Sequence, residues 1–171
     1  MAAITRGVGK IEIGTIAVDG GVATTWATLG YTDRDSTAAL TEEDPTREEL
    51  FALEVDTAVD VDTTGGAITL TYSILNPDTA TLAALWGGTV TGTGNAATWS
   101  RPGTAVSLEK SVKITPKKGL TITIVRGSVV PKLNFDLTKA GKFVIDIVVT
   151  VLQPTKANVD PVLFGPLIVP A

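Results

Sequence analysis

The chain of 171 residues contains no cysteine and no histidine. Without cysteine it has no disulfide bonds and no thiol nucleophile, and without histidine it has no imidazole base. The common zinc sites and serine–histidine–aspartate triads are therefore excluded. The chemistry left to serine, threonine, lysine and carboxylates needs a specific cluster, which the sequence does not present. We therefore predict a protein that is not an enzyme, with no catalytic, cofactor-binding or metal-binding residues.

Short motifs for phosphate or calcium binding are incomplete. Gly9-Lys10 and Gly141-Lys142 lack both the earlier glycine and the following hydroxyl residue of a phosphate-binding loop. Residues 60–65 resemble the start of a calcium loop, but Thr71 stands where the loop needs a bidentate acid. Residues 60–65 are therefore interpreted as a solvated acidic segment. The alternative is that their carboxylates form a weak site for a hard cation.

Aromatic residues, positive charge and long apolar runs are also scarce. Aromatics make up 5% of the chain and the formal net charge is −4, whereas nucleic-acid binding draws on basic surfaces and stacking platforms. No apolar run approaches the roughly 20 residues that span a bilayer. The first residues lack the basic and then apolar layout of a signal peptide. We expect synthesis and folding in the cytoplasm and no membrane association.

Strand patterns dominate what the sequence does contain. With 44% hydrophobic and 19% charged residues, the 171-residue chain suggests one domain with a sizeable core. Ile11 and Ile13 alternate with polar neighbours, and Asp19-Gly20-Gly21 offers a tight turn before a returning strand over residues 22–29. Further strands are predicted over residues 67–74, 106–115, 120–126, 129–137 and 143–152. A turn at Lys117-Lys118-Gly119 separates two of these strands. The predicted fold class is all-β.

One short helix follows the strand over residues 67–74. Asn76 or Asp78 can cap its start, and Pro77 suits its first turn. Its apolar stripe consists of Leu82, Leu85 and Trp86 at helical spacing. Gly87-Gly88 predicts its end, because glycine accepts the left-handed conformation of a C-terminal cap.

Charge is separated along the chain. Residues 33–62 hold eleven acids and two bases, a net charge of −9, and residues 101–142 hold nine bases and two acids, a net charge of +7. We predict that residues 31–62 form a long acidic loop, with one helical turn starting at Asp44-Pro45 and a strand-like stretch over residues 50–55. The two charged regions indicate either partner surfaces or two ordinary solvated faces.

The C-terminal segment, residues 153–171, contains four prolines together with apolar residues such as Phe164 and Leu167. Proline cannot donate to a sheet ladder, so a central strand is excluded there. We predict a domain over residues 1–152 and an extended arm over residues 153–171. That arm docks either on another molecule or on its own domain.

The order of these elements resembles that of the tail tube protein, or major tail protein, of long-tailed bacteriophages. Four features over residues 1–152 carry the resemblance: an opening strand hairpin over residues 9–29, an acidic loop over residues 31–62, a helix between Leu75-Asn76-Pro77-Asp78 and Trp86-Gly87-Gly88, and closing strands that end in residues 139–147. The Pro-rich segment after Gln153 departs from the simplest subunits of this family.

The resemblance implies a two-sheet antiparallel β-sandwich or partial barrel with one short flanking α-helix. It implies a structural virion protein that forms stacked homohexameric rings, and a tube that conducts DNA into the host during genome ejection. Its partners would be copies of itself and other tail proteins such as tape measure, terminator and baseplate or hub proteins. DNA would pass through without specific binding, and assembly would take place in the host cytoplasm.

The separated charges lead to a hypothesis about subunit contacts. A ring joins different surface patches of neighbouring copies, so the acidic loop of one copy would contact the basic region 101–142 of the next. The candidate interface residues are Asp33, Asp35, Glu42, Glu43, Asp44, Glu48, Glu49, Lys110, Lys113, Lys117, Lys118, Arg126, Phe164 and Leu167.

Other functions fit parts of the sequence. A secreted or surface β-sandwich adhesion module would explain the Thr-rich strands and the missing cysteine, although a signal peptide and tandem repeats are lacking. Another virion protein, such as a head–tail completion or capsid decoration protein, would share the fold class. An enzyme is the third alternative, and no cluster of residues supports it.

Overall fold

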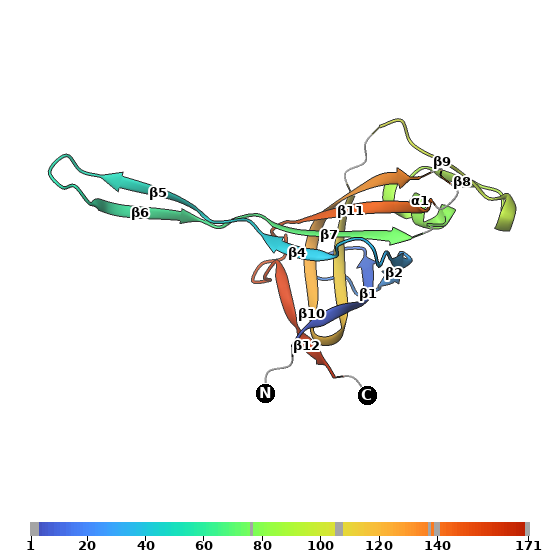
Figure 1. The fold of residues 1–171 in the computed structure, drawn as a ribbon, viewed down its shortest axis with the longest axis horizontal. Helices are drawn as coiled ribbons and strands as arrows, with labels where there is room; N and C mark the ends of the chain where they lie inside the picture. Colours follow the sequence, from blue (N-terminus) through green and yellow to red (C-terminus); the bar gives the residue numbers. More distant parts are fainter. Residues whose placement is uncertain (1–3, 76, 105–107, 137, 139–140, 170–171) are drawn as a thin grey trace.

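A computed structural model describes residues 4–75, 77–104, 108–136, 138 and 141–169 of the chain. These residues form one eight-stranded antiparallel sheet, two separate two-stranded ribbons and a single α-helix (Figure 1). The predicted all-β class with one short helix is therefore confirmed. The main sheet is not closed into a barrel.

The elements follow one another in the order β1 (Arg6–Gly14), β2 (Ala27–Thr28), β3 (Tyr31–Thr32), β4 (Ala39–Glu42), β5 (Thr46–Phe51), β6 (Ala58–Thr64), β7 (Ile68–Leu75), α1 (Thr79–Trp86), β8 (Thr89–Thr91), the 3₁₀ turn η1 (Gly94–Ala96), β9 (Thr98–Ser100), β10 (Leu108–Phe135), β11 (Phe143–Val151) and β12 (Val162–Ile168). The main sheet has the order β2-β1-β10-β11-β7-β3, with β12 paired to β10 and β4 paired to β7. The two ribbons are β5-β6 and β8-β9.

The long strand β10 reverses its own direction. The Ser111 hydroxyl donates a hydrogen bond of 2.6 Å to the carbonyl oxygen of Val125, 14 residues further on. A straight strand would place these residues roughly 46 Å apart. The chain therefore doubles back near Gly119, whose φ of +111° is accessible mainly to glycine (Figure 1). This reversal confirms the predicted turn at Lys117-Lys118-Gly119.

The main sheet bends around one hydrophobic core. The limb of β10 before the reversal pairs with β1, and the limb after it pairs with β11, which pairs in turn with β7. Strands β1 and β7 are not neighbours in the sheet, yet Ile11 and Ile13 of β1 share a core with Leu70 and Ile74 of β7. The predicted sandwich is therefore made by one bent sheet, whose two parts face each other, and not by two separate sheets.

Helix α1 packs its apolar stripe into the same core. Leu82, Leu85 and Trp86 are buried, and no part of Leu85 is accessible to solvent. The stripe that the sequence predicted is thus the face that the helix buries. The indole N–H of Trp99, on the adjacent ribbon, donates to the carbonyl oxygen of Gly87 at 2.9 Å and so covers the C-terminal end of the helix.

Asp78 is the N-terminal cap of α1, as one of the two predictions had it, and Gly87 is its C-terminal cap. The predicted alternative cap, Asn76, lies outside the described residues, as do Lys139 and Ala140 of the predicted turn before the last strand of the domain. The Thr81 backbone N–H donates to the Asp78 carboxylate at 2.7 Å. This hydrogen bond holds the pKa of Asp78 below its usual range.

Replacing the cap, Asp78→Ala, should lower the free energy of unfolding by about 1 kcal/mol at neutral pH. Because the pKa of Asp78 is lower in the folded chain than in the unfolded chain, its carboxylate stabilises the fold above about pH 4 and loses that effect as pH falls further. Urea unfolding of dilute protein should therefore show a smaller difference between wild type and Asp78→Ala at pH 3 than at pH 7. Asp78→Asn keeps a capping oxygen and should resemble the wild type at pH 7. An Asp78→Ala effect that is equal at both pH values would contradict the assignment.

Two sequence predictions for the N-terminal half are wrong. The returning strand over residues 22–29 is reduced to the two residues of β2, because the Ala23 N–H donates to the Ser111 hydroxyl and not to a strand neighbour. The helical turn predicted from Asp44-Pro45 is also absent, since β5 begins at Thr46. The segment expected as an acidic loop is instead a β-hairpin, because β5 and β6 satisfy each other's backbone groups in a ladder that carries on from β4 and β7.

Part of the Pro-rich C-terminal segment docks on its own domain. Strand β12 pairs with β10 immediately after the reversal, with Leu120 opposite Leu167 and Ile122 opposite Phe164. Among the described residues β12 has no second strand partner, and an edge position suits the proline at 166. Phe164 and Leu167 keep 63% and 48% of their surface exposed.

Candidate assembly surfaces

The first candidate surface is a projecting arm, defined here as residues 44–65. Strands β4 and β7 form the base of this hairpin, where Glu42 lies opposite Ile68 and the Glu43 N–H donates to the carbonyl oxygen of Ala67 at 3.0 Å. The same two chain segments continue outward as β5 and β6. Figure 1 shows the arm extending far from the body of the molecule.

Both faces of the arm are open to solvent. Six large apolar side chains of the arm keep between 47% and 103% of their surface exposed: Leu50, Phe51, Leu53, Val55, Val59 and Val61. A two-stranded hairpin is only marginally stable alone in water, and contiguous exposed apolar surface marks contact sites. The arm therefore has the properties of a segment that another molecule covers.

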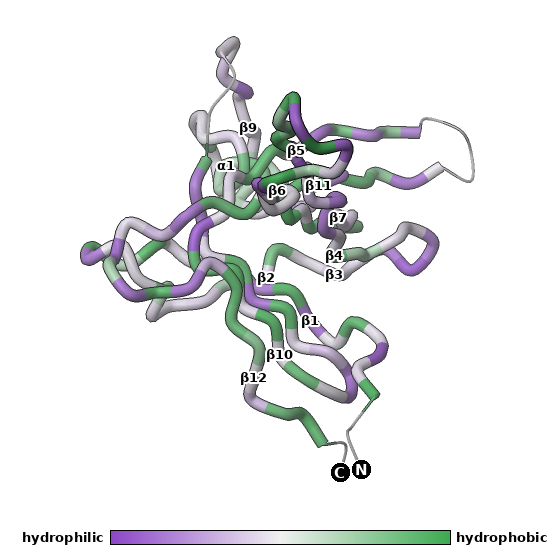
Figure 2. The backbone as a smooth tube through the Cα atoms, turned by 90° about the vertical axis from the view of Figure 1, so that its left-hand side faces the viewer, coloured by the Kyte–Doolittle hydropathy of each residue, from purple (hydrophilic) through white to green (hydrophobic). Residues whose placement is uncertain are grey.

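The arm is also acidic, with seven acids, one base and a net charge of −6. Glu48 lies directly opposite Asp62 in the ladder between β5 and β6, so two acidic side chains share one face, with their Cβ atoms about 5 Å apart. Leu50 and Asp60 form the next pair on that face. Figure 2, which looks at the arm from its tip, shows hydrophilic and hydrophobic segments side by side in β5 and β6. Like charges in opposite positions destabilise a ribbon, so a cation supplied by another molecule would stabilise it.

Predicted interface acids outside the arm divide into two groups. Glu42 and Glu43 are exposed at the base of the arm, beside Asp44. Asp33 is buried, and the Lys142 ammonium donates to it at 2.8 Å and to Asp35 at 2.9 Å. These hydrogen bonds lower the pKa of Asp35 and raise the pKa of Lys142. The structure thus gives Asp33 and Asp35 a role within the subunit.

Some predicted interface bases are likewise paired within the chain. Arg126 donates two hydrogen bonds, of 2.8 and 2.9 Å, to the Glu109 carboxylate and lowers its pKa. Lys113 forms an ion pair of 3.2 Å with Glu12. Their positive charge is therefore already partly balanced, which leaves less of it for a partner.

The second candidate surface is a basic tip, defined here as Arg6, Lys117 and Lys118, where β10 reverses. Arg6 lies opposite Lys118 in the ladder between β1 and β10. The aliphatic stem of Lys117 lies beside Gly7. A Cβ atom added to this glycine would lie 3.4 Å from the Cδ atom of Lys117. Within the described part of the chain none of these three cations has a carboxylate partner, whereas five other cations do.

Exposed apolar residues adjoin the basic tip. Ile4 is 74% exposed and Leu120 is 41% exposed, and Leu120 lies beside Leu167 of β12. The predicted candidates Lys117, Lys118 and Leu167 therefore lie near one another. The sequence prediction did not include Arg6. This residue lies in the same group because β1 pairs with β10, which brings Arg6 opposite Lys118, more than one hundred positions away in the sequence.

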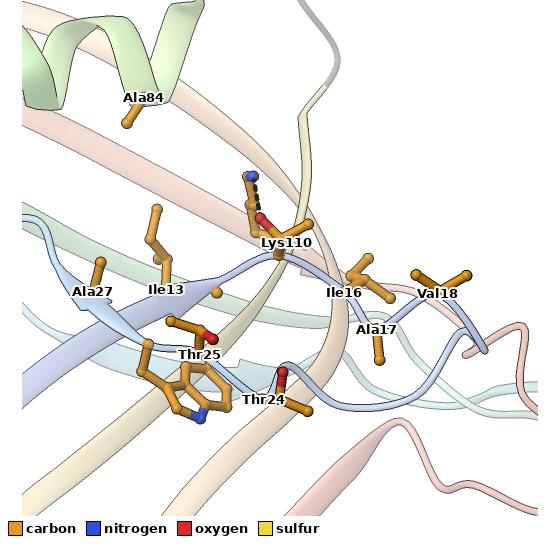
Figure 3. Close-up of a pocket in the computed structure, with 12 residues that line it drawn as sticks. Ile13, Ile16, Ala17, Val18, Thr24, Thr25, Ala27, Ala84 and Lys110 are labelled. Carbon is orange, nitrogen blue, oxygen red and sulfur yellow. Dashed lines mark hydrogen bonds between the residues drawn. The ribbon is translucent and has the colours of Figure 1, made fainter.

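An open cleft of about 620 Å³ lies beside the end of β1 (Figure 3). Its wall includes Ile13, Val18 and Trp26, and Ala84 of helix α1. Among the described residues that line it, Lys110 is the charged one, and its ammonium donates to the Thr15 hydroxyl at 3.2 Å. Of the lining residues that the structure describes, none is a carboxylate that could work with this lysine in acid–base chemistry. The cleft therefore offers mainly apolar surface, and its described lining has no pair of groups suited to acid–base catalysis.

No cluster of three or more potential metal ligands occurs among the residues that the structure describes. In the same residues no helix has the length and apolar character needed to cross a bilayer. A comparison of the sequence with models of known protein families found no match, and a comparison with curated proteins found none either.

Proposed function

We propose that the chain is a structural virion protein that assembles with copies of itself into the stacked, hexameric rings of a phage tail tube. The observation that carries this proposal is the arm, a solvent-exposed hairpin with six exposed apolar side chains and a net charge of −6. Such a ribbon becomes stable when a second surface covers it. The proposal of stacked rings, as the type of assembly, rests on the resemblance between the order of elements in this chain and that of tail tube subunits.

Copies of the same chain are the partners that the surface favours. The arm combines negative charge with exposed apolar side chains, whereas the basic tip combines positive charge with exposed apolar side chains beside it. The two surfaces are therefore complementary in charge. A contact between two different patches of identical subunits is heterologous, and it closes into a ring or continues as a filament. Stacked rings need both lateral and axial contacts of this kind, and the long arm and the exposed edge of β12 are two separate surfaces that suit them.

Electron microscopy of the purified chain in negative stain tests the proposal. We expect concentrated protein to form rings or tubes with a central opening. Isolated small particles at every concentration and ionic strength would contradict self-assembly and would favour the adhesion module. Rings that never stack would point instead to a head–tail completion protein. Within a virion, the chain should lie along the tail, and other tail proteins should cap the two ends of its tube.

A further inference from the structure

Two cross-strand pairs in this chain place like charges opposite each other, and the two pairs have opposite signs. Glu48 faces Asp62 in the arm, and Arg6 faces Lys118 in the basic tip. The Cβ atoms of residues in opposite positions lie about 5 Å apart on one face of the sheet, where like charges repel. Each pair therefore carries a repulsion that an opposite double charge would remove.

The two pairs do not neutralise each other within one copy. The arm extends sideways from the body, and the reversal of β10 lies at another end of the molecule, beside β1 and β12 (Figure 1). No ion pair among the described residues joins the arm to the body. Neutralisation consequently requires a second molecule.

The other basic surfaces fit the arm less well. Carboxylates of the same chain already pair with Lys113, Arg126 and Lys142. The described lining of the cleft offers one charged group, Lys110, and not a pair of cations. The basic tip combines three cations that have no carboxylate partner within the described part of the chain with exposed apolar neighbours, Ile4 and Leu120. The arm presents the matching combination, since Leu50 lies on the same face as Glu48 and Asp62.

We infer that the basic tip is the receptor for the arm of a second copy, with the Glu48–Asp62 pair placed against the Arg6–Lys118 pair. This inference rests on the proposed self-assembly and specifies the contact that produces it. Apolar residues beside each charged pair, Leu50 on the arm and Leu120 next to the tip, are covered in the same contact. Since the two patches differ, each copy gives one arm and receives one arm, so the contact propagates from copy to copy.

A charge-exchange experiment tests this contact. The arm variant Glu48→Lys/Asp62→Lys carries a positive ladder pair on the arm and keeps the positive pair at the tip, and the tip variant Arg6→Glu/Lys118→Glu keeps the negative pair on the arm and carries a negative pair at the tip. Like charges brought together across a contact oppose binding strongly, so each variant alone should need a roughly tenfold or higher concentration to assemble. An equal mixture should assemble again, because each positive arm pair meets a negative tip pair and each negative arm pair meets a positive tip pair.

A matched control is Glu54→Lys/Asp56→Lys, which changes the net charge of the arm by the same amount outside the ladder pair. This control should assemble more readily than the arm variant. A chain that combines all four exchanges should assemble alone, which provides a second test if one double variant folds poorly. The receptor assignment is overturned if the mixture and the fourfold variant both fail to assemble while the wild type assembles. A wild type that does not assemble would instead contradict the proposed function.

Discussion

Replacing the arm, residues 44–65, by Asn-Gly is expected to give a folded chain that no longer assembles. The deletion joins Glu43 to Gly66, whose backbones already lie in contact at the base of the hairpin. Because the register of β4 and β7 places Glu43 opposite Ala67, the new connection is a three-residue loop of Asn, Gly and Gly66. Three-residue loops with a terminal glycine are common in hairpins, so β4 and β7 would become an ordinary hairpin. The arm contributes no residue to the buried core cluster, so the thermal unfolding midpoint should change by only a few degrees.

The assembly of this armless chain can be followed by light scattering at increasing concentration. The wild type should show a rise in mean mass with concentration, whereas the armless chain should keep the mass of a monomer. A circular dichroism spectrum typical of β-structure would show that the body has folded. If the armless chain assembled as readily as the wild type, the arm would have no part in the contact, and the surface would have to be sought at β12 or the cleft.

The second large effect concerns the body. Leu85→Ala should lower the free energy of unfolding by about 3 kcal/mol, within the usual range of about 2–5 kcal/mol for such a change in a core. Leu85 has no accessible surface and projects from α1 into the core that β1, β7, β10 and β11 share. The truncation removes apolar contacts and leaves a cavity that the bent sheet fills only in part. Urea unfolding of dilute full-length protein, below the concentration at which it assembles, measures the effect in the same background as the control below.

Leu53→Ala is the matched control for this substitution. Leu53 is fully exposed near the end of the arm, so in the full-length chain the change should alter stability by no more than about 0.5 kcal/mol. It should nevertheless raise the concentration needed for assembly, because an apolar side chain of the arm is lost. Equal destabilisation by the two substitutions would mean that the arm packs on the body, contrary to the structure described above.

The features that the sequence predicted are those that local patterns encode. The strand that holds Leu70 and Ile74 shows a clean alternation of apolar and polar residues because one of its faces is buried. The helix is indicated by a capping aspartate, an apolar stripe that includes Leu85, and a glycine at its end. The turn in β10 was predictable because lysines and glycine interrupt two β-branched runs. In each case the determining residues lie within one turn or one strand.

The features that the sequence did not predict depend on distant pairings. In the arm, the alternation that marks a strand is confined to the Val-Asp-Val-Asp run of residues 59–62, because neither face of the arm is buried, and so short a run did not predict the hairpin. The contact of Asp33 with Lys142 joins positions 109 residues apart, and it changes a predicted interface acid into a group used inside the subunit. Arg6 meets Lys118 only through the register of β1 against β10. Charge counts along the chain identified acidic and basic regions, but they could not tell which charges are already paired.

Sedimentation velocity of the unmodified chain, from dilute to concentrated solution, tests most directly whether this molecule is built to associate with itself. The account predicts a monomer at the lowest concentrations and fast-sedimenting species that grow as concentration rises. A single slow boundary that never changes, in both low and high salt, would contradict it.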